Sequence, residues 1–322
     1  MEKIREIPLA SLKPIAFIHE QVAAIAEAVG SGVAVNALSG GVDSSVVTLL
    51  GHRALGSRLK TCFIENGIMR EGEARRITSL FKRLGVKVEV VDAGRQFFAA
   101  LAGVEDPEEK REAITQAFYK TVFGPLVKKG RAQFLLQGTN YTDVEETVAG
   151  VKRQHNILAQ LGIDTVKTFG YTVLEPIIRL RKTGVRKVAR ALELPKEIWD
   201  RPPFPGPALA ARVIGAVTPE RIAVVRAATA IVEEELAGSG AFQYLAILHQ
   251  DRVTGVRSGR RQFGLQIEVR CWESTDAVTA TPTQIAFAKL TRLADRITSE
   301  VDGVVSVTYN VTRKPPSTIE AV

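Results

Sequence analysis

Short apolar runs alternate with helical segments in the first part of the chain, and this alternation restricts the fold more than any other feature. The first apolar run, residues 33–38, is bounded by glycines and follows a segment, 14–29, whose apolar residues recur at helical spacing. Further strands are predicted at 60–64, 86–91 and 133–136, and helices after the first strand, at 70–84 and within 94–127. Strands that alternate with helices form βαβ units. We therefore predict a doubly wound parallel sheet with helices on both faces.

The pattern changes after a proline-rich segment at 202–207, where four prolines exclude regular structure. The remaining sequence predicts two helices separated by strand-like runs: helices at 218–236 and 283–299, strands at 242–248, 251–257, 264–270 and 304–311. Strands grouped between helices are typical of a smaller α+β domain with an antiparallel sheet. We place the domains at 1–205 and 206–322.

Composition excludes several classes of protein. Hydrophobic residues make up 45% and charged residues 24%, which is ordinary globular usage. No stretch approaches the roughly 20 apolar residues of a membrane helix, and the N-terminus lacks an export pattern. We therefore expect a cytoplasmic protein with no membrane partner. Two cysteines, Cys62 and Cys271, without CxxC spacing or a histidine cluster, support neither a disulfide framework nor a zinc site.

The formal net charge is +8, which suits an anionic partner. Nucleotides satisfy this excess as well as nucleic acid does, and we expect no nucleic acid partner. Basic residues cluster at 179–190 and at 252–261. Each cluster is as consistent with a solvated helix or hairpin face as with a binding site.

A glycine- and serine-rich loop joins the first predicted strand to the following helix. Its residues are Ser39, Gly40, Gly41, Val42, Asp43, Ser44 and Ser45. A loop in this position binds anions, because the first amides of the helix lack internal partners and the helix dipole is positive there. The glycines allow consecutive amides to point inward, the serines add donors, and Asp43 is suited to Mg²⁺. The loop lacks the Gly-Lys-Ser/Thr ending of a Walker motif. A plain glycine-serine turn with an aspartate cap is the structural alternative.

The whole run Ser39 to Ser45 resembles the pyrophosphate loop of ATP pyrophosphatases, which cleave ATP between its α and β phosphates. Further segments resemble the ATP pyrophosphatase part of the GMP synthetase family, particularly the archaeal form whose glutaminase is a separate polypeptide. These segments are 63–70, 137–146, 151–156, 201–207 and 312–320. The resemblance therefore covers nearly the whole chain.

This resemblance implies a two-step reaction on xanthosine monophosphate. The purine 2-oxygen attacks the α phosphorus of MgATP, pyrophosphate leaves, and ammonia then displaces AMP to give GMP. ATP and Mg²⁺ are the implied cofactors. The residues implied to bind ATP are Ser39, Gly40, Gly41, Val42, Asp43, Ser44, Ser45, Asn66 and Gly138, with Asp43 holding the metal.

Further site residues follow from the same resemblance. Lys152 is implied as a catalytic cation beside Asp43, carried on a lid segment that also contains His155. Asp143 and Glu146 are implied to position a metal or the nucleotide, although carboxylates at i and i+3 often simply face solvent at the start of a helix.

In this family the second domain supplies dimer contacts and much of the substrate site. Lys314, Ser317, Thr318 and Glu320 lie in the matching C-terminal string. Arg212 and Arg270 are additional candidate anion donors, and a surface salt bridge is an equally good reading of each. The implied assembly is a homodimer that receives ammonia from a separate glutamine amidotransferase subunit.

Departures from the family pattern gather around substrate recognition. They include Glu65 in place of aspartate, Thr183-Gly184 in place of two acidic residues, and Ala208 in place of glycine. One alternative is a paralogue that adenylates another oxo-base and installs nitrogen or sulfur, for which Cys62 is a possible nucleophile. A second alternative is a nucleotide sensor that has lost turnover.

Overall fold

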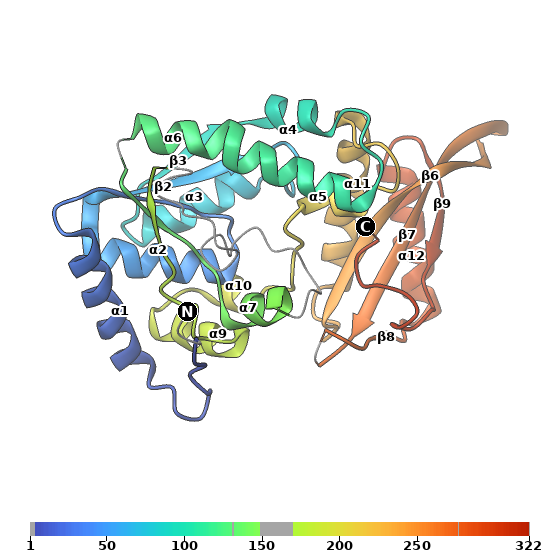
Figure 1. Cartoon of the computed structure of the whole chain (residues 1–322). Coiled ribbons are helices and arrows are strands. Elements are labelled where there is room, and N and C mark those ends of the chain that lie inside the picture. Colours follow the sequence, from blue (N-terminus) through green and yellow to red (C-terminus); the bar gives the residue numbers. More distant parts are fainter. Residues whose placement is uncertain (1–3, 131, 149–169, 276, 322) are drawn as a thin grey trace. The chain divides into compact units, whose positions relative to one another are not determined.

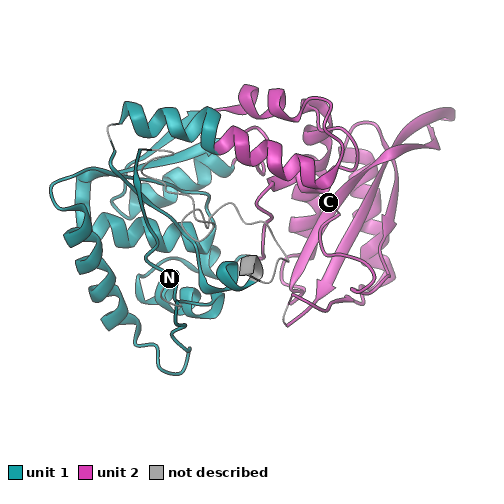
Figure 2. Ribbon diagram, in the orientation of Figure 1, with its two compact units in different colours: residues 1–65, 73–92, 119–201 teal, residues 66–72, 93–118, 202–322 magenta. Residues whose placement is uncertain are grey.

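The computed structural model describes residues 4–130, 132–148, 170–275 and 277–321. They form two compact units, one of residues 1–65, 73–92 and 119–201, the other of residues 66–72, 93–118 and 202–322 (Figure 2). Each unit is described by itself below. Among the described residues, no helix is both long and apolar enough to cross a membrane.

The first unit is built on a parallel sheet with the strand order β3-β2-β1-β4-β5 (Figure 1). The strands are β1 Ala34–Ala37, β2 Leu59–Glu65, β3 Val88–Asp92, β4 Phe134–Leu136 and β5 Thr172–Leu174. The chain runs outward from β1 to β3 and then returns to the other side of β1. The order therefore reverses between β1 and β4, and ligands of open parallel sheets bind at the carboxyl ends of strands at such a reversal.

Helices cover this sheet, as predicted for a doubly wound fold. They are α1 Pro14–Val29, α2 Val42–Leu55, α3 Glu73–Arg83, α6 Gly124–Lys129, α7 Tyr141–Val148, α9 Lys182–Ala191 and α10 Lys196–Trp199, with a 3-10 turn at Gly56–Arg58 and a π-helix at Ala117–Phe123 that ends in this unit. The helices α1, α2 and α9 pack together, and α3 packs on β2 and β3. The α6 helix lies on the opposite side of the sheet from α2 and α9 (Figure 1).

A buried polar link ties the central strand to its neighbours. Asn36 on β1 donates to Thr48 Oγ1 on α2 at 2.6 Å and accepts from Thr61 Oγ1 on β2 at 2.8 Å. Thr48 Oγ1 in turn donates to the carbonyl of Ser44 at 2.7 Å. Because buried polar groups are costly unless they are paired, this chain of bonds fixes α2 relative to β1.

The second unit contains the proline-rich segment and a mixed sheet. Its elements are α4 Gly94–Leu101, α5 Pro107–Gln116, the 3-10 helix Ala208–Arg212, α11 Pro219–Leu236, β6 Gln243–Arg257, β7 Arg260–Glu273, β8 Thr281–Pro282, α12 Phe287–Glu300 and β9 Val304–Tyr309. The strands β6, β7 and β8 pair antiparallel, whereas β9 pairs with β7 in parallel. The two strands expected at 242–248 and 251–257 form one strand, with a shift in register between Leu248 and Arg252.

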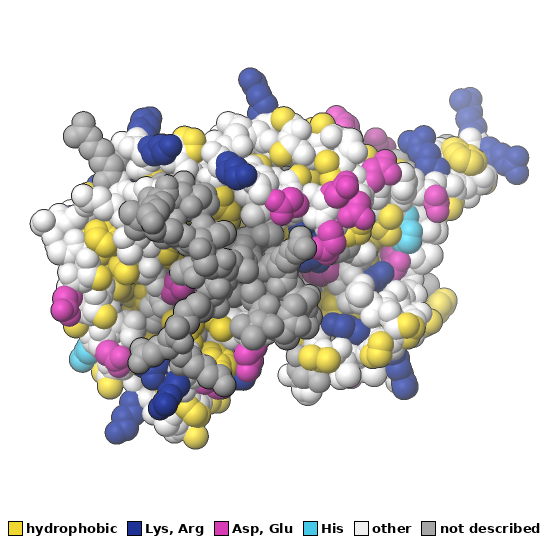
Figure 3. Space-filling model, in the orientation of Figure 1, with side chains coloured by type: hydrophobic (Ala, Val, Ile, Leu, Met, Phe, Trp, Pro, Cys, Tyr) yellow, Lys and Arg dark blue, Asp and Glu magenta, His cyan; other side chains and the backbone are white. Residues whose placement is uncertain are grey.

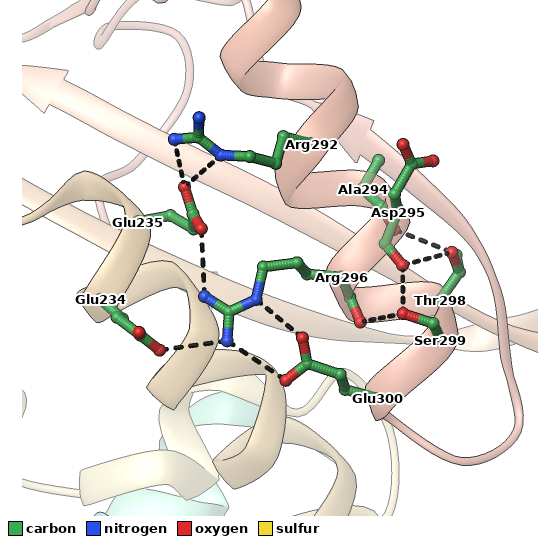
Figure 4. Close-up of polar contacts among 9 residues, drawn as sticks. All are labelled: Glu234, Glu235, Arg292, Ala294, Asp295, Arg296, Thr298, Ser299 and Glu300. Carbon is green, nitrogen blue, oxygen red and sulfur yellow. Dashed lines mark hydrogen bonds and ion pairs between the residues drawn. The ribbon is translucent and has the colours of Figure 1, made fainter.

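The helices α11 and α12 of this unit pack against each other as well as on the sheet. Figure 4 shows the ion pairs that join them: Arg296 bonds Glu235 at 3.0 Å and Glu234 at 3.1 Å, and Arg292 bonds Glu235 at 2.7 Å. Arg296 also pairs with Glu300 within α12. These groups are largely solvated, so salt screens the pairs and they add little to stability.

The basic cluster at 252–261 lies at the end of the β6–β7 hairpin, where Lys and Arg side chains gather on the surface (Figure 3). Arg252, Arg260 and Arg261 are exposed, and Val256 beside them is 75% exposed. Arg257 donates to the carbonyl of Thr298. This cluster is therefore largely a solvated hairpin face.

Thr48→Val tests the buried polar link. The substitution keeps the shape of the side chain but leaves the Asn36 amide and the Ser44 carbonyl without their partner, so we expect a loss of about 1–3 kcal/mol in the free energy of unfolding. Urea unfolding of the whole chain measures it, in the transition of the first unit.

Thr229→Val is the matched control in the second unit. Thr229 is equally buried, but its hydroxyl has no hydrogen-bond partner within the described residues. We expect this variant to be neutral or slightly more stable, because removing an unpaired buried hydroxyl costs nothing. Equal losses in the two variants would contradict the role assigned to the link.

Candidate nucleotide site

The loop after β1 opens directly into α2, as the sequence predicts. Gly40 has a φ of +81°, a conformation that favours glycine, and Gly41 is the N-cap residue, without a side-chain cap. Val42 is buried as the first helical residue. The first amides of α2 are thus not capped by a side chain, which leaves them available to an anion.

The serines of the loop hold its backbone in shape. The hydroxyls of Ser39 and Ser44 lie 3.0 Å apart, and Ser44 Oγ lies 3.2 Å from the Ser39 amide and donates to the Gly41 carbonyl at 3.1 Å. Ser39 is exposed, whereas Ser45 is fully buried and its hydroxyl has no hydrogen-bond partner within the described residues. The three predicted serines therefore differ: two form the turn and one has unused bonding capacity.

Asp43 lies in the first turn of α2 and is only partly satisfied by the protein. Its Oδ2 accepts from Lys182 Nζ, at the start of α9. Its Oδ1 is buried and has no hydrogen-bond partner within the described residues. An oxygen of this kind is suited to a hard cation. Mg²⁺ typically binds one or two carboxylates together with phosphates and water. The described residues contain no group of three or more acidic, histidine or cysteine ligands.

The segment after β4 contacts the loop closely. A Cβ at Gly138 would lie 3.2 Å from the Ser44 amide nitrogen and 3.3 Å from the Asp43 carbonyl carbon. The glycine therefore lets the two backbones approach at the strand-order reversal. This geometry brings the predicted residue Gly138 together with Asp43 and Ser44.

Asp143 begins α7 in a reciprocal cap. Asn140 Oδ1 accepts from the amide of Thr142 at 2.9 Å, and Asp143 Oδ2 accepts from the amide of Asn140 at 3.0 Å. One oxygen of Asp143 thus has a structural role at the start of the helix. The side chain of Glu146 lies outside the described residues, so the predicted Asp143–Glu146 pairing stays a prediction.

Glu175 follows β5 at the same edge of the sheet and was not predicted from the sequence. Its Oε1 is buried without a hydrogen-bond partner in the described part of the chain. Burial raises the pKa of Glu175, and although a hydrogen bond with Thr139 lowers it, the nearby Asp143 carboxylate raises it further. Clusters of carboxylates with raised pKa values are typical of functional sites.

The basic cluster at 179–190 is not a solvated face. Besides Lys182 on Asp43, Arg181 pairs with both oxygens of Glu145 at 2.6 Å and with Glu6 at 3.0 Å. Sequence analysis found the cluster but not Lys182 as a site residue, because nothing in a linear pattern links Lys182 to Asp43. Lys152 and His155, both predicted on the lid, lie outside the described residues.

Cys62 is poorly suited to nucleophilic chemistry. It is a buried residue of β2 that contacts the carbonyl of Asn36 at 3.6 Å. Burial raises the pKa of its thiol to about 12. Because the thiolate is the reactive species, the geometry favours a structural role.

In the second unit, the predicted arginines hold the C-terminal segment. Arg212 is 1% exposed and bonds both oxygens of Glu320, at 3.1 and 3.2 Å, while Gln243 bonds Glu320 at 2.6 Å. Arg270 donates to the carbonyl of Thr318 at 2.8 Å and to Glu268 at 2.5 Å. The salt bridges anticipated as the alternative reading are therefore present, and for both arginines they are buried.

Glu268 completes this anchor. Burial by itself raises the pKa of Glu268, but hydrogen bonds from His249, Asn310 and Arg270 outweigh that effect and lower it to about 2. The carboxylate is therefore ionised at neutral pH and balances the charge of Arg270.

Lys314, Ser317 and Thr318 lie in the segment that these contacts fix. Lys314 pairs its backbone with Ala280 and donates its ammonium to the carbonyl of Ala277 at 2.7 Å. The hydroxyl of Ser317 lies 3.4 Å from the carbonyl of Thr318. No carboxylate partner of Lys314 is found among the described residues, so its positive charge is not neutralised by an ion pair.

Asn66 belongs to the second unit, in the turn after β2. Its side-chain oxygen accepts from the amide of Ile68 at 3.0 Å. Arg226 of α11 donates to the carbonyls of Gly67 and Met69, at 2.5 and 2.8 Å, which fixes the turn. The predicted role of Asn66 in ATP binding stays a prediction.

Two family models match the chain. The NAD synthase model matches residues 14–207, and the model of the GMP synthase C terminal domain matches residues 231–321. The first match covers the parallel sheet and the loop after β1, and the second covers most of the mixed sheet. The second match is what distinguishes GMP synthases from NAD synthases here.

Full-length relatives carry the same combination. A glutamine-hydrolyzing GMP synthase subunit of Archaeoglobus fulgidus is 47% identical over 94% of this chain and 98% of its own length. The protein of the same name from Methanocella arvoryzae is 48% identical over 95% and 98%. The glutamine-hydrolyzing GMP synthase of Aeropyrum pernix is 42% identical over 96% of this chain but only 61% of its own length. As the motif resemblance predicted, the chain belongs to the GMP synthase family, among its archaeal-type ATP pyrophosphatase subunits.

Proposed function

We propose that the chain catalyses the ATP-dependent amination of xanthosine monophosphate to GMP, with release of AMP and pyrophosphate. The observation that carries the proposal is the loop at the reversal of strand order, in which Asp43 Oδ1 and the Ser45 hydroxyl are buried without partners among the described residues. Family membership supports ATP as the nucleotide. The names of the relatives supply the product.

In the first step, the purine 2-oxygen forms a bond to the α phosphorus of ATP and the bond to pyrophosphate breaks. The amides at the start of α2, with the hydroxyls of Ser39, Ser44 and Ser45, bind the departing pyrophosphate. Phosphoryl transfer depends mainly on such positioning and on neutralisation of charge. Lys182 adds a cation beside Asp43, and Lys152 is proposed as a second cation that approaches with the lid.

Mg²⁺ is proposed to bind Asp43 through the oxygen that lacks a partner within the described residues, with phosphate oxygens completing its coordination. When bound, the ion neutralises phosphate charge. Asp143 and Glu146 are proposed to orient the nucleotide at the end of β4. Glu175, whose pKa is raised by burial, is proposed to join them.

In the second step, ammonia forms a bond to the purine carbon and AMP leaves. A separate glutamine amidotransferase subunit is proposed as the source of ammonia. The names of the relatives include glutamine hydrolysis, and the Aeropyrum pernix protein is much longer than this chain. That difference in length supports a division of the two activities between polypeptides.

The second unit is proposed to bind xanthosine monophosphate. Lys314 supplies a positive charge without an ion-pair partner in the described part of the C-terminal segment, and Ser317 and Thr318 supply hydroxyls. Arg212, Arg270 and Glu320 hold that segment in place. A homodimer, a cytoplasmic location and a domain boundary at 205/206 stay predictions from the sequence.

The proposed reaction predicts a defined dependence on the acceptor. With ATP, Mg²⁺ and ammonia, we expect pyrophosphate release with xanthosine monophosphate and none above background with inosine, adenosine or uridine monophosphate. The coupled release of pyrophosphate measures it. Release with another base alone would support a paralogous acceptor, and no release with any would leave a nucleotide-binding protein without turnover.

Asp43→Asn tests the proposed metal ligand. The amide keeps the size of the side chain but removes the charge, so we expect the rate of AMP formation to fall by about 100-fold or more. The control is Asp200→Asn, which removes an exposed aspartate from a lysine pair within α10 and the residue that follows it. Unchanged AMP formation in Asp43→Asn would exclude the proposed role of the loop.

Gly138→Ala tests the close approach of the two loops. The added Cβ would press on the Ser44 amide, so we expect the KM for ATP to rise by about three- to ten-fold with little loss of stability. Gly184→Ala is the control: its Cβ would make ordinary contacts inside α9, and we expect about 0.5–1 kcal/mol of added stability with an unchanged KM. A steady-state titration of ATP distinguishes the two variants.

A further inference from the structure

A buried carboxylate lies against the nucleotide loop. Glu73 is the first residue of α3 and is 2% exposed. A Cβ at Gly40 would lie 3.0 Å from Glu73 Oε1 and 2.8 Å from Ile77 Cδ1. The loop therefore packs on the side chains of Glu73 and Ile77 at the residue whose φ is +81°.

A negative charge in this place needs an explanation, because the loop is suited to anions. An unbalanced carboxylate so close to the loop would repel bound phosphates, and burial would strengthen the repulsion. Burial of an unpaired charge also costs stability. A carboxylate is tolerated at this position only where cations balance it.

Arg201 supplies the balance. Its guanidinium bonds both oxygens of Glu73, at 2.5 and 2.8 Å, and is 19% exposed. Arg76, one turn along α3, adds a third bond at 3.1 Å. Two parallel bonds from one guanidinium fix the plane of the carboxylate as well as its charge. Arg201 is also the first residue of the proline-rich string, which carried part of the family resemblance but had no assigned role.

We propose that Arg201 is a positioning residue of the nucleotide site, which neutralises Glu73 so that this side chain supports the loop at Gly40 without opposing the bound pyrophosphate. The proposal rests on the proposed function, since it takes the ligand of the loop to be pyrophosphate. Arg201 acts through Glu73 and Gly40 and does not itself touch the ligand in this argument.

The proposal makes the effects of the two charges unequal. Arg201→Gln removes two of the bonds to a buried carboxylate and leaves the single bond from Arg76, so we expect the Kd of pyrophosphate in the presence of Mg²⁺ to rise by about ten-fold or more. Glu73→Gln keeps the shape under Gly40 and removes the negative charge, so we expect a Kd within about two-fold of the unmodified chain. In the double variant both charges are absent, and we expect a Kd within about three-fold.

Isothermal titration with pyrophosphate and Mg²⁺ measures these constants, and thermal unfolding of each variant is recorded beside it. Steady-state kinetics add a second readout: in Arg201→Gln the KM for ATP should rise while the KM for the acceptor stays unchanged. The control is Arg83→Gln, which removes an exposed partner of Glu197 at the far end of the same helix. It should bind pyrophosphate like the unmodified chain.

Two results would overturn the inference: a folded Arg201→Gln variant with unchanged affinity, or a double variant that binds as weakly as Arg201→Gln. If Arg201→Gln does not fold, the double variant decides, because a purely structural pair would leave it unfolded or at least ten-fold weaker. Failure of the unmodified chain to bind either ATP or pyrophosphate would instead contradict the proposed function.

Discussion

The first unit depends on close packing around one short loop. Gly138 lies against the backbone of Asp43 and Ser44, while Glu73 and Ile77 lie against Gly40. The Asn36–Thr48 link ties the helix behind the loop to the central strand. Since these contacts exist without a ligand, the amides that would bind phosphate are already oriented, and binding need not pay for ordering them.

The fold of this unit was largely predictable from the sequence because its signals are local. Glycine-bounded apolar runs and helical spacing predicted α1 at its observed bounds, and β1, β2 and β4 within a residue or so. The three-residue strand β5 was not predicted, since so short a run has no periodicity. In the second unit, the parallel pairing of β9 with β7 was missed because the partner of a strand is set by tertiary packing.

The candidate site was predictable only where it is contiguous. The loop residues 39–45 and Gly138 were predicted as motif positions, and Gly138 lies beside Asp43 as expected. Lys182 is 139 residues from Asp43, and Arg201 is 128 residues from Glu73. No local pattern encodes such pairs. Ala208 is an intermediate case: it stands where the family has glycine, and its φ of +52° is the backbone conformation that explains that glycine.

Charge pairing also narrows which cations of the second unit can attract an anionic substrate. Arg212 and Arg270 are each matched by a glutamate, so each pair is close to neutral at a distance. Lys314 is bonded to a carbonyl, which orients the ammonium but does not neutralise its charge. The buried arginines are therefore better suited to fixing the C-terminal segment, and Lys314 is better suited to attracting a phosphate. The division resembles that in the first unit, where Arg201 balances Glu73 under the loop and Lys182 contacts the partly unsatisfied Asp43.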